Sequence, residues 1–348
     1  MTRREFARLA TVALVVIAAI SNGTPTAARQ QKATPWVVPW LTEYANGAYS
    51  SVAKRLSQIG DAAQLERDLE TIVTTWTTAK GANQDERRRS IAAFALEAAY
   101  VRLDQPAAAA RLIEWGCRQI RRIPKTRAGE FERYWHMSAF ALLSGAVQPQ
   151  GIELHVTHVK LMFPDEPRLA YERAVAEELR AAPFFESGKA TPADVKKHYE
   201  EAAKRYRDAA RIESVRAEAM TRLGRIEIEL GRPEAALTTL ETVDGSTRDG
   251  VVRYLGRLFR GRALERLNRD DEAAAAYRSA LELAPGAQSG MMSLAALQFS
   301  RGERDEADRT IADLLGRQTP APDPWWVYWP ADFRHIDFLV NGMREAMK

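Results

Sequence analysis

Two histidines are the first residues whose type and spacing suggest chemistry. His155 and His158 stand three residues apart in a helical pattern, so both imidazoles would project from one helix face, with Asp165 and Glu166 a little further along the chain. A catalytic zinc site needs three protein ligands and an open position. No third ligand stands at helical spacing, so we interpret the pair as packing residues and expect no metal and no cofactor. A metal-dependent hydrolase built around them is a distant alternative.

Other signatures of catalysis are missing from the sequence. It has no glycine-rich phosphate loop, no HExxH helix and no GxSxG turn. Cys117 is the only cysteine, so no disulfide can form within the chain. Its place in an apolar helical stretch favours a buried, inert thiol over a nucleophile. The sequence therefore predicts a protein that is not an enzyme and has no catalytic residues.

An aromatic segment near the C-terminus is another candidate for ligand chemistry. Residues 324–330 contain three of the eight tryptophans: Trp325, Trp326 and Trp329. One interpretation is a cap that covers the last apolar helix face before a terminal helix. The other is an exposed aromatic platform, since exposed tryptophan is costly unless it is used. The platform would make the chain a glycan- or small-ligand-binding protein.

The first 28 residues have the features of a targeting segment. Three arginines precede an apolar run over 9–20 that is too short to span a bilayer, and small residues follow as far as Ala28. The opening Thr-Arg-Arg-Glu-Phe resembles a bacterial twin-arginine signal, with an ordinary secretory signal or an uncleaved anchor as alternatives. We expect cleavage near Ala28, a periplasmic or secreted mature chain, and membrane contact only through the signal peptide before cleavage.

The composition is that of a globular protein. Of the 348 residues, 46% are hydrophobic and 28% are charged, which argues against wholesale disorder and against a multi-span membrane protein. The net charge of +4 falls by two when residues 1–28 are removed, because they hold three arginines and one glutamate. Acidic and basic residues are otherwise interspersed, so we expect no nucleic-acid partner.

Internal repetition dominates the rest of the chain. From about Pro39 to Leu315 apolar residues recur at spacings of three and four, which predicts an all-α protein. Three segments align without gaps around residues that tolerate a left-handed backbone at a helix-ending turn: Gly231, Asn268 and Gly302. A small residue that lets a second helix pack closely follows each turn: Ala236, Ala273 and Ala307.

These units resemble tetratricopeptide repeats, which are helix–turn–helix units with a period of 34 residues. The resemblance also uses Gly224, Gly261 and Ala295, which occupy the same place in the first helix of each unit. The best units are 217–250, 254–287 and 288–315, and weaker echoes upstream suggest degenerate repeats. The family's fold implies a right-handed α-solenoid of helical hairpins.

The predicted organisation follows from these observations. We expect a signal peptide at 1–28, a degenerate helical-repeat block at 29–182 and a linker at 183–191. A block of tetratricopeptide-like repeats should follow at 192–318, and a Trp-rich cap with a terminal helix at 319–348. Thr191 and Asp194 flank a proline in a pattern that predicts the capped start of a helix.

The resemblance further implies a binding surface. In the family the concave wall comes mainly from the first helix of each hairpin, which would place these residues on it: Arg225, Arg262, Leu258, Met292 and Phe299. Two guanidinium groups in line would hold carboxylates of an extended or acidic peptide, with the apolar residues gripping side chains between them. Alternatively, both arginines are solvated or pair with Glu227 and Glu265. The sequence thus predicts a scaffold or adaptor for a protein or peptide partner.

Overall fold

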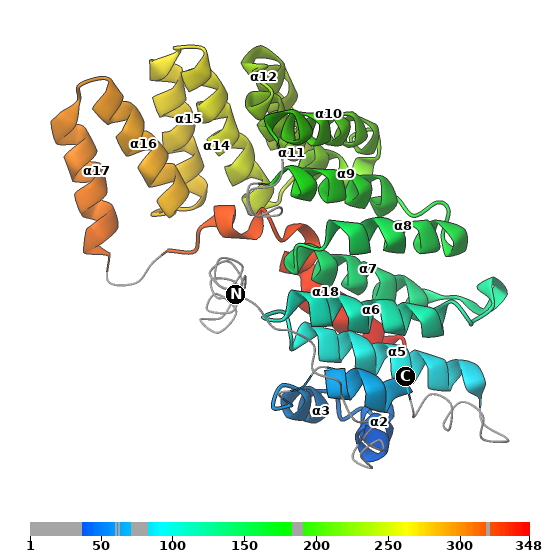
Figure 1. Ribbon diagram of the computed structural model, residues 1–348. Coiled ribbons are helices and arrows are strands. Elements are labelled where there is room, and N and C mark those ends of the chain that lie inside the picture. The colour runs from blue at the N-terminus through cyan, green and yellow to red at the C-terminus, as the bar shows by residue number, and fades with distance from the viewer. Residues whose placement is uncertain (1–36, 60, 62, 71–82, 183–190, 318–320) are drawn as a thin grey trace. The chain divides into compact units, whose positions relative to one another are not determined.

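The computed structural model describes residues 37–59, 61, 63–70, 83–182, 191–317 and 321–348, and within them it shows helices and turns but no strand (Figure 1). The predicted signal peptide lies outside the described residues, as does the predicted linker apart from Thr191. None of the described helices combines the length and apolar character needed to cross a membrane.

The helices form two compact units. The terminal unit comprises the described residues up to 165 together with 330–348, and the central unit comprises 166–329. The boundary between the two units lies at residues 165 and 166. Its position follows from helix α9 (Arg168–Ala181), which packs along α10 (Pro192–Ala209) and so belongs to the central unit. As predicted, Thr191 caps α10, because its hydroxyl accepts a hydrogen bond from the Asp194 amide.

The terminal unit is built mainly from helical hairpins. After α2 (Val37–Ala45) and α3 (Tyr49–Leu56), α5 pairs with α6 and α7 pairs with α8. Helix α5 spans Gln84–Tyr100, α6 spans Pro106–Ile120, α7 spans Glu130–Gly145 and α8 spans Pro149–Met162. The end of the chain returns to this unit, where η4 (Ala331–His335) and α18 (Ile336–Glu345) pack against α7.

The central unit continues the same plan. After α9 and α10, α11 pairs with α12, α14 with α15, and α16 with α17. Helix α11 spans Arg216–Glu229, α12 spans Pro233–Glu241 and α14 spans Gly250–Arg266. Helix α15 spans Asp270–Leu283, α16 spans Gln288–Ser300 and α17 spans Arg304–Gly316. The short α13 (Val243–Ser246) precedes α14, and the single-turn η3 (Pro324–Val327) packs on α14. Consecutive hairpins of this kind confirm the predicted all-α solenoid.

The turn residues and the small residues after them have the predicted roles. The backbone is left-handed at Gly231, Asn268 and Gly302, where φ is 72°, 58° and 80°. Ala236, Ala273 and Ala307 are all buried. Short-range sequence signals therefore set how each hairpin of the central unit turns and closes.

Gly261 lets α14 approach α15 closely. A Cβ atom at this position would lie 2.4 Å from Cε1 of Tyr277, whose ring is fully buried. We expect Gly261→Ala to lower the free energy of unfolding by about 1–3 kcal/mol, because overpacking displaces the ring. Urea denaturation measures the change. Gly245→Ala is the matched control, since a Cβ there meets nothing within 4 Å. Equal losses in the two variants would contradict the packing argument.

Candidate functional site

The surface predicted to bind a peptide is the face of the first helices of the hairpins, and in the central unit the chain itself covers part of it. Residues 323–329 pack on α14 and its neighbours (Figure 1). The ring of Tyr328 lies 5.5 Å from that of Phe259, and the ring of Trp325 lies 6.0 Å from it. Asp323 accepts a hydrogen bond from the Ser289 hydroxyl at 2.8 Å, which ties the start of the segment to α16.

Arg225 lies beneath this segment and does not face an open groove. Arg222 and Arg225 are both buried and donate to the two carboxylate oxygens of Glu178, at 2.9 Å and 3.0 Å. The hydroxyls of Tyr206 and Tyr328 donate to the same carboxylate. Burial alone would raise the pKa of Glu178, but the two guanidinium groups and the hydroxyls hold that pKa below its ordinary value. The cluster is a buried ionic network that fixes Tyr328 to α9 and α11.

The other predicted groove residues divide into buried and open. Leu258 is fully buried in the core of the central unit, so it cannot contact a partner. Arg262 is half-buried, with its guanidinium 5.1 Å from the ring centroid of Trp325. Met292 and Phe299 are 47% and 62% exposed on α16. Only these last three residues keep access to solvent.

The three tryptophans do not form one exposed platform. Trp325 and Trp329 are partly buried and pack against the core of the central unit. Trp329 also receives the Arg225 guanidinium over its ring, at 4.5 Å from the centroid. Trp326 alone is exposed, at 42%. This arrangement fits a covering segment and removes the basis for a three-ring glycan site.

In the terminal unit, helix α18 covers part of the corresponding face. Arg344 of α18 donates to Glu97 of α5 at 2.8 Å, and the Tyr44 hydroxyl donates to the same buried carboxylate at 3.1 Å. A Cβ atom on Gly342 would lie 2.5 Å from the ring of Tyr134, so α18 and α7 are in close contact. The first-helix face of each unit is thus covered in part by the C-terminal segment of the chain.

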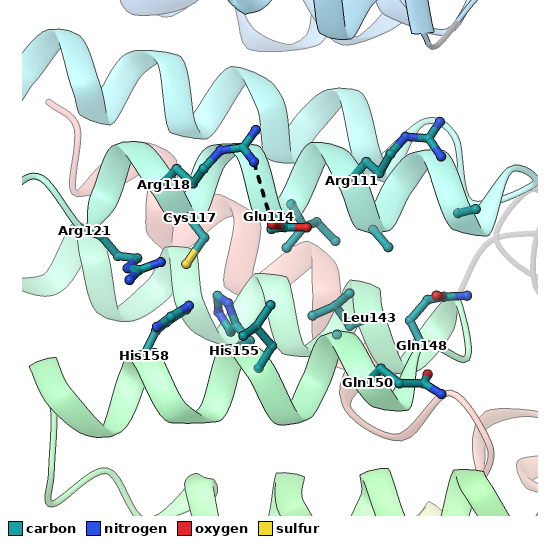
Figure 2. Close-up of a pocket in the computed structure, with 15 residues that line it drawn as sticks. Arg111, Glu114, Cys117, Arg118, Arg121, Leu143, Gln148, Gln150, His155 and His158 are labelled. Atoms are coloured by element: carbon teal, nitrogen blue, oxygen red, sulfur yellow. Dashed lines mark ion pairs between the residues drawn. The ribbon is translucent and has the colours of Figure 1, made fainter.

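An open groove lies instead between the second helices α6 and α8 of the terminal unit (Figure 2). Its volume is about 530 Å³. On the α6 wall it is lined from Ala107 to Arg121, a length of about 21 Å at 1.5 Å per residue. The α8 wall includes Leu154, His155 and His158. The groove is therefore elongated along α6.

The spacing of residues on the two helices gives the groove its character. Arg111, Glu114, Arg118 and Arg121 recur every three or four residues and form one exposed stripe on α6. Leu154 and Leu161 stand two turns apart on α8 and are 49% and 59% exposed. One wall of the groove is consequently basic, and the other presents Leu154 to solvent among polar side chains that include Gln150 and His158.

The charges on the α6 wall are paired only at the surface. Arg111 lies 3.1 Å from Glu66, and Arg118 lies 3.7 Å from Glu114 and 4.0 Å from Glu70. Figure 2 shows the Arg118–Glu114 pair at the edge of the groove. Because exposed pairs of this kind contribute only about 0–1 kcal/mol, carboxylates from another molecule can replace these partners at little cost.

A buried histidine pair lies beside the groove. Nδ1 of His136 on α7 is 3.0 Å from Nε2 of His155, and the ring of Phe140 is 4.9 Å from that of His155. Burial and then the neighbouring His158 lower the pKa of His155 to about 3, and burial lowers the pKa of His136 as well. Both rings are therefore neutral at pH 7. His155 is a packing residue, as the sequence predicted, and His136 is a partner that the sequence did not indicate.

Cys117 and the two α8 histidines line the same groove, and Figure 2 shows their side chains between α6 and α8. Within the described part of the terminal unit, donor atoms of Cys117, His155 and His158 do not come within 4.8 Å of one another as a set of three.

The Cys117 thiol is buried, as predicted, with 3% of its surface exposed. Burial raises the pKa of this thiol to about 12. Since the thiolate is the reactive form, we expect Cys117 in the folded chain to react with iodoacetamide at pH 8 about 1000-fold more slowly than in urea-unfolded chain. Mass spectrometry of timed samples measures both rates. Rapid alkylation of the folded chain would contradict this assignment.

Comparison with known proteins finds one match to a family model. Residues 257–286, in α14 and α15, match the family model for the tetratricopeptide repeat. This segment lies within the unit predicted at 254–287. No curated protein matches the chain.

Two solved structures resemble the chain at low sequence identity. One is the apo form of the quorum sensor NprR from B. thuringiensis, with 15% identity, a TM-score of 0.45, and coverage of 86% of this chain and 81% of that one. The other is NprR in complex with its cognate peptide NprX, with 15% identity, a TM-score of 0.42, and coverage of 89% and 85%.

Proposed function

We propose that this protein is a tetratricopeptide-type scaffold that binds a protein or peptide partner in the α6–α8 groove. One observation carries the proposal: the groove is open and about 21 Å long, whereas the first-helix face that the family resemblance indicated is covered in part by the chain's own C-terminal segment. A helical-repeat fold supplies extended surfaces for such contacts.

The partner-binding residues that we assign come from both walls of the groove. Arg118 and Arg121 supply charge from α6, and Leu154 supplies an exposed apolar side chain from α8. Met292 and Phe299 on α16 form a second exposed apolar area, but Arg225 and Leu258, which would have completed that site, are buried.

We also propose that the scaffold acts outside the cytoplasm, in the periplasm or after secretion. The support is the arginine-rich start, the short apolar run over 9–20 and the small residues up to Ala28. Fractionation of cells that express the full chain tests this. An Arg3→Lys, Arg4→Lys variant that stays in the cytoplasm would assign the twin-arginine route, and wild-type chain found only in the cytoplasm would overturn export.

Affinity capture with matched variants tests partner binding. The bait is the chain from Arg29, incubated with extract of the source cells, and captured proteins are identified by mass spectrometry. The groove variant carries Arg118→Glu and Leu154→Glu. The control variant carries the same kinds of change on α17, Arg309→Glu and Leu315→Glu, where both native side chains are also exposed.

The outcomes of this capture separate the alternatives. A protein retained by wild type and by the α17 control, and lost by the groove variant, is the expected result. A protein retained equally by all three baits would show that the α6–α8 groove is not the interface.

A further inference from the structure

We infer that the α6–α8 groove selects an extended, acidic peptide segment of about six residues, in which carboxylates alternate with apolar side chains. This inference rests on the proposed function and adds the chemistry of the partner. It follows from the charge of one wall, the exposed Leu154 on the other, and the length of the groove.

The charge of the α6 wall favours carboxylates. Three arginines line it against a single glutamate, Glu114, and the two α8 histidines add no negative charge. The side chains of Arg111 and Arg118 are 50% and 45% exposed, so a carboxylate from another molecule can reach them and replace their present partners. Arg121 is exposed at the end of the groove nearest His158. A guanidinium group matches a carboxylate in planar, two-point geometry, so the wall suits acidic side chains better than neutral ones.

The opposite wall offers one exposed apolar contact, Leu154, among polar lining residues. Leu154 is 49% exposed, and Gly151 places no side chain between it and the groove floor, where Leu143 lies. In an extended chain, successive side chains point to opposite sides. A segment that lies along the groove can therefore direct every second side chain toward the arginines and the others toward the α8 wall, where Leu154 is exposed.

The length of the groove sets the length of the segment. An extended chain rises about 3.3 Å per residue, so about 21 Å accommodates about six residues. A volume of about 530 Å³ over a length of about 21 Å gives a mean cross-section of about 25 Å², which is too narrow to enclose a helix about 10 Å wide. The geometry therefore fits an extended segment better than a helix.

Fluorescence anisotropy with two labelled hexapeptides tests the inference. The first peptide alternates glutamate with leucine, and the second has lysine in place of each glutamate. The protein is the whole chain from Arg29, as wild type, as Arg118→Gln with Arg121→Gln, as Leu154→Gln, and as an Arg309→Gln control on α17. Circular dichroism shows that each variant is folded.

We expect the glutamate peptide to bind wild type and the Arg309→Gln control alike. The arginine double variant should bind it about 5- to 20-fold more weakly, and Leu154→Gln about 2- to 5-fold more weakly. Equal or tighter binding of the lysine peptide would overturn the inference, as would unchanged affinity in the double variant. A third outcome would also overturn the inference: inorganic polyphosphate displaces the glutamate peptide, and Leu154→Gln leaves the affinity for that peptide unchanged. Together these results would indicate a general anion site.

The proposed function and the inferred partner chemistry are tested separately. If neither peptide binds, the inferred partner chemistry is wrong. The capture experiment above then still decides whether the groove binds a protein, because it does not depend on the sequence of the probe.

Discussion

Replacing Glu178 by leucine is expected to lower the free energy of unfolding by about 3–5 kcal/mol. The change leaves the guanidinium groups of Arg222 and Arg225 buried without their shared carboxylate, and it removes the acceptor for the Tyr328 hydroxyl. Loss of that anchor should also free residues 323–329. We therefore expect a red shift of tryptophan fluorescence from Trp325 and Trp329, measured alongside urea denaturation.

The matched control for this experiment is Glu201→Leu on α10. Glu201 pairs with Arg205 at 2.9 Å but is 41% exposed, so its loss should cost no more than about 0.5 kcal/mol. A Glu178→Leu variant as stable as this control would contradict the assignment of Glu178 as the centre of a buried ionic network.

Acid should destabilise the terminal unit through the His136–His155 pair. Both rings have a folded-state pKa below the unfolded value of about 6.5, so the unfolded chain binds more protons and stability falls as the pH drops below about 6.5. Between pH 7.5 and pH 5 we expect a loss of about 2–4 kcal/mol, measured by urea denaturation at each pH.

The structure explains why the folded pair resists protonation. Nε2 of His136 is buried with no hydrogen-bond partner among the described residues, so a proton added there finds no acceptor. The ionisable groups nearby are His158 on α8, with Glu114 and Arg121 acting on His158 from α6. His136→Gln should remove about half of the pH dependence, and Thr157→Gln on the exposed side of α8 should not change it. Equal pH dependence in His136→Gln and wild type would contradict this account.

The fold could be predicted because its signals are local. Gly231, Asn268 and Gly302 mark turns by their own backbone preferences, and the buried alanines after them mark close helix contacts. These properties depend on neighbours within one hairpin, so the sequence shows them directly.

The site could not be predicted in the same way because it depends on distant residues. Arg225 has the spacing of a groove residue, yet its partner Glu178 is 47 positions earlier, and Tyr328 is 150 positions after Glu178. No periodicity links such positions. His136 was missed for the same reason, since it meets His155 from another helix. The return of the C-terminal segment to the first-helix faces therefore appears only in the structure.

The α6 stripe is an intermediate case. The spacing of Arg111, Arg118 and Arg121 is visible in the sequence and predicts a charged helix face, which is usually a solvated surface. Only the position of α8, with Leu154 opposite, turns that face into one wall of a groove.

Site-specific photo-crosslinking tests the location of the partner most directly. A photoreactive amino acid is placed at position 154 in the α6–α8 groove in one chain, and at position 299 on the first-helix face of α16 in another, because both native side chains are exposed. After capture of the partner and irradiation, our account predicts a crosslinked product from position 154 and none from position 299. A product from position 299 alone would contradict it and would return the binding site to the first-helix face.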